Sequence, residues 1–156
     1  MAPRIAIAVI GAGEAPAEVC ALAREAGRRI AERAAVLICG GRTGVMEAAA
    51  AGASEAGGHT IGVLPSYDRS SANKHIEFAI ATGMGQTRNA IVVASAAAVI
   101  ALAGEGGTLS EIGLAIKLGR PVVALEAWLE IRGINHASTA AEAVALAFDL
   151  AERAGR

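Results

Sequence analysis

Four glycine-rich turns are the parts of this sequence best suited to bind a ligand. Their glycines are Gly11 and Gly13, Gly40, Gly41 and Gly44, Gly83 and Gly85, and Gly104, Gly106 and Gly107. Glycine lets a ligand approach the backbone amides closely, and a helix N-terminus presents unpaired N–H groups and a partial positive charge. The turns therefore predict a binding site for a phosphate or another anion. The alternative is that these glycines only form tight turns.

Five polar side chains in these turns extend the predicted site. Arg88 begins a helix, where its guanidinium could hold a phosphate through two hydrogen bonds or could form a surface ion pair instead. Thr108 either donates its hydroxyl to the anion or caps its own helix. Glu111 either closes a capping box with Thr108 or acts catalytically, by stabilising positive charge on a sugar or orienting a water. Thr43 and Asn89 complete the predicted binding residues.

Two further polar features bear on the same site. Glu105 lies inside the last glycine turn, where its carboxylate would repel a phosphate unless it points outward. The polar segment 65–75 is long enough to act as a lid, although an ordinary solvated loop is the alternative. The side chains of this segment that could reach a ligand are Arg69, Ser70, Asn73 and Lys74.

Short apolar strands alternate with amphipathic helices along the chain. Strands are expected at residues 5–10, 35–39, 59–65, 76–81, 97–103 and 121–126, and helices at 16–34, 44–56, after 82–89, before Gly119 and after Thr139. Thr139 with Glu142 reads as a capping box. The strands are apolar throughout, as parallel strands covered on both faces must be. The pattern predicts a single doubly wound, Rossmann-like α/β domain over residues 1–156, with the turns at one edge of its sheet.

Composition excludes several classes of function. The net charge of −1 gives no footprint for nucleic acid. No metal site is expected, because the two cysteines, Cys20 and Cys39, and the three histidines lack metal-ligand spacing. The two thiols are expected to be buried, which fits a cytoplasmic protein. No signal peptide or membrane span is expected, since the longest uncharged stretch is 89–104. Neither GxGxxG nor a GKS or GKT sequence occurs, which argues against ordinary dinucleotide binding and ATP cleavage.

The motifs carry a family resemblance over nearly the whole chain. The segment CGGRTGVMEAAAAGASEAGG and, after it, SSANKHIEFAIATGMGQTRNAIVVASAAAVIALAGEGGTLSEIGLAIKLGRPVVAL resemble the superfamily of the Lonely Guy (LOG) phosphoribohydrolases, often labelled lysine-decarboxylase-like. Within it, the chain is most similar to the short branch that contains the molybdenum cofactor carrier proteins.

The resemblance implies two functions. The carrier branch implies a homodimer or homotetramer that holds a phosphorylated pterin, the molybdenum cofactor, or a nucleotide. The hydrolase branch implies cleavage of nucleoside 5′-monophosphates without a metal, with Arg88 and Glu111 as the catalytic residues. Its signature PGGxGTxxE is matched except for Ala103 in place of proline and Glu105 in place of glycine. Lysine decarboxylation is rejected, because the chain's lysines, Lys74 and Lys117, do not lie in a setting suited to pyridoxal phosphate.

Overall fold

The structure, a computed structural model, describes residues 3–155 and contains one seven-stranded sheet. The strands are β1 (Ala6–Ile10), β2 (Val36–Cys39), β3 (Thr60–Leu64), β4 (Phe78–Ala81), β5 (Ala98–Ala101), β6 (Val122–Leu125) and β7 (Asn135–Ala137). They pair in parallel in the order β4-β3-β2-β1-β5-β6-β7. The chain winds outward from β1 in one direction and then, from β5, in the other. This arrangement confirms the predicted doubly wound α/β fold.

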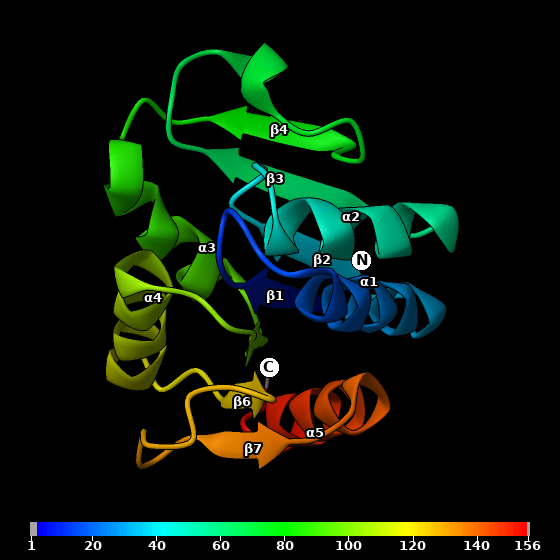
Figure 1. The fold of residues 1–156 in the computed structure, drawn as a ribbon, viewed down its shortest axis with the longest axis vertical. Coiled ribbons are helices and arrows are strands. Elements are labelled where there is room, and N and C mark those ends of the chain that lie inside the picture. The colour runs from blue at the N-terminus through cyan, green and yellow to red at the C-terminus, as the bar shows by residue number, and fades with distance from the viewer. Residues whose placement is uncertain (1–2, 156) are drawn as a thin grey trace.

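Helices cover both faces of the sheet. They are α1 (Ala17–Glu32), α2 (Val45–Glu55), α3 (Asn89–Ser95), α4 (Gly106–Lys117) and α5 (Ala140–Arg153), with short 3-10 turns η1 (Arg69–Ser71) and η2 (Gly85–Arg88). Figure 1 shows α1, α2 and α5 on one side of the sheet and α3 and α4 on the other. Among the described residues, no helix is long and apolar enough to cross a membrane.

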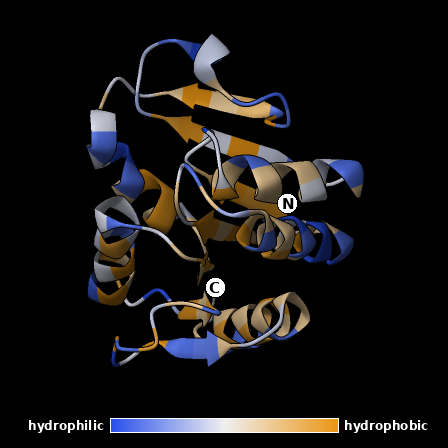
Figure 2. Cartoon of the chain, in the orientation of Figure 1, coloured by the Kyte–Doolittle hydropathy of each residue, from blue (hydrophilic) through white to orange (hydrophobic). Residues whose placement is uncertain are grey.

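The central strands β1, β2, β5 and β6 contribute side chains to two separate cores, one on each face of the sheet. In β1, Ile7 and Val9 pack toward α1, α2 and α5, whereas Ala8 and Ile10 pack toward α3 and α4. A strand covered on both faces gains from an apolar side chain at every position, which explains the continuous apolar runs in the sequence. The central strands are accordingly coloured mostly as hydrophobic in Figure 2, while β7 and the outer turns of α1 are hydrophilic.

The backbones of α1 and α2 come very close together at two glycines. A Cβ atom built on Gly52 would lie 1.9 Å from the carbonyl oxygen of Arg24, and one built on Gly27 would lie 2.0 Å from that of Ala49. A Cβ atom would overlap these backbone oxygens, so both positions require glycine. This close seam lets two short helices cover the same half of the sheet.

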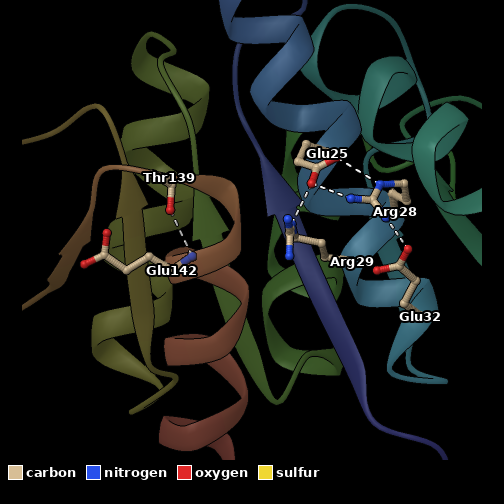
Figure 3. A network of polar contacts seen from close by, with 6 residues as sticks. All are labelled: Glu25, Arg28, Arg29, Glu32, Thr139 and Glu142. Carbon is tan, nitrogen blue, oxygen red and sulfur yellow. Dashed lines mark hydrogen bonds and ion pairs between the residues drawn. The ribbon is translucent and has the colours of Figure 1, made fainter.

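The outer face of α1 carries the charges that its helical pattern predicts. Glu25 pairs with Arg28 and Arg29 at 2.6 Å each, and Arg28 also pairs with Glu32 (Figure 3). Such exposed pairs each stabilise a helix by about 0.3–0.5 kcal/mol. The apolar face of α1, rather than these pairs, supplies most of its contribution to stability.

The start of α5 confirms the predicted capping of this helix by Thr139. Strand β7, which precedes α5, was not predicted. The Thr139 hydroxyl accepts a hydrogen bond of 3.1 Å from the amide of Glu142, and the carboxylate of Glu142 accepts one of 3.1 Å from the amide of Ser138. This is the predicted capping box (Figure 3). Strand β7 was not predicted, because its three residues, with Asn135 and His136 among them, are too short and polar a run to indicate a strand.

Candidate functional site

A cleft of about 730 Å³ opens at the carboxyl ends of the strands, at the point where the strand order reverses between β1 and β5. Ligands of doubly wound proteins bind at this position. The cleft is lined after β1 by residues 11–14, after β2 by Arg42, Thr43 and Met46, after β3 by Pro65 and Ser66, after β4 by Gln86, Arg88 and Asn89, and after β5 by Glu105, Gly107, Thr108 and Glu111. The volume is in the range typical of small-molecule sites, roughly 300–1,000 Å³.

The N-terminus of α4 leaves amides unpaired beside the cleft. The helix begins at Gly106, its N-cap residue Glu105 makes no side-chain capping bond, and the first amide to bond back is that of Leu109, 2.9 Å from the carbonyl oxygen of Glu105. The amides of Gly106, Gly107 and Thr108 therefore lack an intrahelical acceptor, and Gly107 and Thr108 line the cleft. This is the backbone arrangement that an anion satisfies.

The structure excludes one alternative for Thr108 and Glu111. Thr108 lies inside α4 rather than at its N-cap position, so the two residues do not form a capping box. Thr108 is buried, and its hydroxyl lies over Gly104, where a built Cβ atom would come within 2.1 Å of Oγ1. Gly104 thus provides the space that lets the hydroxyl of Thr108 lie at the cleft wall.

Glu111 is a buried carboxylic acid in the cleft wall. It is only 8% exposed, and no described residue donates a hydrogen bond to its carboxylate or forms an ion pair with it. Burial raises the pKa of Glu111 to about 7, with the charge of Arg88 opposing that shift. A buried carboxylate without a partner is costly to a folded protein, and such groups gather at functional sites.

Arg88 is held rigidly, with one nitrogen left over. Its Nε donates to the carbonyl oxygen of Val63 at 2.8 Å, and its Nη1 donates to the side-chain oxygens of Asn89 and, at 3.4 Å, Gln86. None of the described residues accepts a hydrogen bond from Nη2. Burial lowers the pKa of Arg88, while the charge of Glu111 raises it. A fixed guanidinium with a free N–H edge in a cleft is suited to an anionic group.

The turns after β1 and β2 fit against each other. The Thr43 hydroxyl donates to the carbonyl oxygen of Gly13 at 2.8 Å, and the amide of Val45 donates to the carbonyl oxygen of Ala12 at 3.0 Å. A Cβ atom on Gly11 would lie 2.7 Å from the side chain of Val45. These contacts fix the two turns as one wall of the cleft.

About half of the predicted site residues line the cleft. Those that do are Gly11, Gly13, Thr43, Arg88, Asn89, Gly107, Thr108 and Glu111, and those that do not are Gly40, Gly41, Gly44, Gly83, Gly85, Gly104 and Gly106. Several of the second group have structural reasons to be glycine, as the positive φ angles of Gly41, Gly44, Gly83 and Gly85 show.

The polar segment 65–75 reaches the cleft only at its first two residues. Arg69, Ser70, Asn73 and Lys74 do not line it. Asn73 instead supports the turn after β2. Its side-chain amide donates to the carbonyl oxygen of Arg42 at 2.7 Å, and its backbone amide donates to the carbonyl oxygen of Gly41 at 2.9 Å. Part of this segment is thus a support for the cleft wall.

Sequence reasoning missed Arg42, Glu14 and Gln86, which also line the cleft. Each is a polar residue inside or beside a glycine turn, so their position next to Gly41, Gly13 and Gly85 was the available signal. Arg42 and Glu14, together with Arg88, Glu105 and Glu111, place ionisable groups of both signs in the cleft, and Gln86 adds a neutral amide. Within residues 3–155, no three His, Cys, Asp or Glu side chains lie together as a metal site would require.

The two thiols differ in their surroundings. Cys39 is fully buried, accepts a hydrogen bond from the amide of Gly41 at 3.3 Å, and has its pKa raised by burial to about 11. Cys20 is only partly buried, so the expectation of two buried thiols is wrong for this residue. Neither thiol lines the cleft.

Comparison with known proteins identifies close relatives over nearly the full length. A model of the SLOG cluster4 family matches residues 4–152. An uncharacterized protein of Archaeoglobus fulgidus is 44% identical over 138 residues, covering 88% of this chain and 91% of that protein. The molybdenum cofactor binding protein of the phototrophic bacterium Rippkaea orientalis is 37% identical, with a TM-score of 0.89 and coverage of 95% of this chain and 98% of that one. The Moco carrier protein of Chlamydomonas reinhardtii is 34% identical, with a TM-score of 0.89 and coverage of 97% and 99%.

Proposed function

The chain belongs to the SLOG cluster4 family, and on that premise we propose that it binds and carries a phosphorylated small molecule, with the molybdenum cofactor as its cargo. The observation that carries this proposal is the open N-terminus of α4 beside Arg88, whose Nη2 has no acceptor among the described residues. Free amides and a fixed guanidinium together suit a phosphate group. The names of the solved relatives, a molybdenum cofactor binding protein and a Moco carrier protein, support the same cargo.

The donors and acceptors of the cleft fit a phosphorylated pterin. Its phosphate would interact with the amides of Gly107 and Thr108 and with Arg88. A pterin ring carries amino and ring N–H groups, and the carboxylates of Glu14 and Glu105 line the same cleft as acceptors for such groups. The aromatic side chains of Tyr67 and Trp128 do not line the cleft. We therefore expect the ring to be held by hydrogen bonds and not by stacking.

The test is cofactor retention in a host that synthesises the molybdenum cofactor. The protein is purified without oxygen, and its molybdenum and its oxidised pterin are measured by mass spectrometry and fluorescence. Wild type should retain both. Arg88→Ala should bind at least about tenfold more weakly, since a hydrogen bond to a charged group contributes roughly 1.5–3 kcal/mol. Arg69→Ala is the matched control, because Arg69 is exposed and does not line the cleft. Equal retention in wild type and Arg88→Ala would contradict the assigned site.

A second candidate function is cleavage of the N-glycosidic bond of nucleoside 5′-monophosphates. The observation that favours it is Glu111, a buried acid whose pKa is raised to about 7. Arg88 would hold the phosphoribosyl group, while Glu111 would stabilise an oxocarbenium-like transition state and position a water. Glu105 weighs against it, because its carboxylate lies where the hydrolase signature has glycine.

Incubation with AMP and related monophosphates, followed by chromatography of the free base, separates the two functions. The carrier proposal expects no release of base. Release that disappears in Glu111→Ala would replace it with the hydrolase function. Binding of AMP without release, seen as a rise in melting temperature, would support a nucleotide as alternative cargo.

We also propose that the chain forms a homodimer or homotetramer. The side chains of Leu109, Ile116 and Leu118 on and just after α4 are 49%, 48% and 44% exposed, on the helix that covers the outer side of β5 and β6. Leu109 and Ile116 are seven residues apart and share one face of α4, and exposed apolar side chains on one helix face mark interaction surfaces. Light scattering should give a mass of two or four chains, and Ile116→Glu should reduce it to one. An unchanged mass in that variant would place the interface elsewhere.

A further inference from the structure

Gly40 directly follows β2 and lies beside the guanidinium of Arg88, and its reason for being glycine differs from that of Gly41 and Gly44. Gly41 and Gly44 have φ angles of 75° and 66°, a conformation that other residues rarely adopt. Gly40 has no positive φ angle, is buried, and does not line the cleft. Neither backbone conformation nor contact with a ligand therefore accounts for glycine at this position.

The space beside Gly40 does account for it. A Cβ atom built there would lie 2.7 Å from Sδ of Met46, 2.8 Å from Nη2 of Arg88 and 3.2 Å from its Cζ. The guanidinium thus occupies the volume that a side chain at position 40 would need. Nη2 is also the nitrogen of Arg88 that has no acceptor among the described residues.

We propose that Gly40 is a positioning residue, which keeps the guanidinium of Arg88 in the place where its Nη2 faces the anion of the ligand. This inference rests on the proposed role of Arg88 in ligand binding. A side chain at position 40 would push Nη2 away from its place while Nε remains tied to the carbonyl oxygen of Val63. The donor would then be misdirected even though the arginine is retained.

The contacts of Gly40 make the proposal testable without destroying the fold. The atoms nearest to a Cβ atom there belong to the side chains of Met46 and Arg88, and none of them is a backbone atom. In contrast, one on Gly52 or Gly27 would overlap backbone oxygen atoms. Gly113 is the matched control, since a Cβ atom on this glycine of α4 would meet nothing within 4 Å.

The experiment follows the Arg88 Nε–H signal in the NMR spectrum of protein labelled with ¹⁵N-arginine, assigned by its loss in Arg88→Lys. Gly40→Ala should shift this signal and speed its exchange with water, and Gly113→Ala should leave it unchanged. In titrations with inorganic phosphate, Gly40→Ala should weaken binding about tenfold, because a donor displaced by about 1 Å loses much of its interaction. Gly40→Ala should add no further loss in the Arg88→Lys background.

The outcomes separate the inference from the proposed function. An Arg88 signal unaltered by Gly40→Ala would overturn the positioning role, as would additive losses of phosphate binding in the double variant. A second outcome would be that Gly40→Ala alters the Arg88 signal while Arg88→Lys leaves phosphate binding intact. This outcome would contradict the proposed role of Arg88 in binding but would keep its contact with Gly40. Should Gly40→Ala unfold, the proposal expects Met46→Ala and Arg88→Lys together to restore folding and Met46→Ala alone not to, and rescue by Met46→Ala alone would count against the inference.

Discussion

The N-termini of α4 and α5 share a sequence spacing and differ in structure. Each contains a threonine followed three residues later by a glutamate, Thr108 with Glu111 and Thr139 with Glu142. In α5 the two side chains bond to backbone amides and close the helix end. In α4 the same pair lies inside the helix, and neither side chain caps it.

The difference separates a helix end that stabilises the fold from one that is available to a ligand. Four helices start beside the cleft, and none has a side-chain capping bond at its N-cap residue, which is Pro16 in α1, Gly44 in α2, Arg88 in α3 and Glu105 in α4. α5 starts away from the cleft and is capped. An amide that is capped by its own chain cannot also bind a ligand, so the uncapped helix ends are consistent with the proposed binding site.

The largest effect on stability is expected for the two glutamates, where replacing Glu111 should differ most from replacing Glu142. The folded protein retains the proton of Glu111 up to about pH 7, whereas the unfolded chain releases it near pH 4.3. Folded protein therefore binds more protons in this window, and the contribution of Glu111 to stability falls as pH rises from about 4.3 to 7 and is constant above it. Glu111→Gln should be more stable than wild type by on the order of 1–3 kcal/mol at pH 8.

Urea unfolding at pH 5 and pH 8 tests this expectation. The gain from Glu111→Gln should be small at pH 5, where folded wild type holds Glu111 largely in its neutral form. A gain of equal size at both pH values would mean that ionisation of Glu111 is not its source.

The threonines should show an intermediate effect. Thr139→Val removes the hydroxyl that accepts from the amide of Glu142, and loss of such a cap costs about 1 kcal/mol. Thr108→Val removes a hydroxyl for which the structure shows no hydrogen bond within residues 3–155, so stability should change by less than about 0.5 kcal/mol. Chemical denaturation of the two variants side by side is the measurement. Equal losses would show that Thr108 supports its helix after all.

An effect smaller than that of Thr139→Val is expected at Glu142. Glu142→Gln keeps an oxygen that can accept from the amide of Ser138 and removes only a charge near the helix N-terminus, which costs about 0.3–1 kcal/mol. Glu142→Gln should therefore lower the stability of the protein, whereas Glu111→Gln should raise it at pH 8. Thermal unfolding of both variants checks the sign, and a stabilising Glu142→Gln would remove the contrast between the two helix ends.

The amino-acid sequence was enough to predict the fold class, most of the strands and the edge of the sheet at which the cleft opens. Continuous apolar runs require strands covered on both faces, and glycine turns after parallel strands must meet at one edge. It also identified Arg88, Thr108 and Glu111, because polar residues within such turns are few. Local spacing also sufficed for the capping box of α5, since its hydrogen bonds join residues within a single helical turn.

Packing between distant parts of the chain determines which of the two identical spacings forms a cap and which glycines line the cleft. The starting residue of α4 depends on how β5 and the turn after it meet the neighbouring turns, and spacing within four residues does not contain that information. The same holds for Gly40, whose neighbour Arg88 is far away in the sequence and close only in the fold. Long-range packing therefore determines which atoms of a correctly predicted turn are left for a ligand.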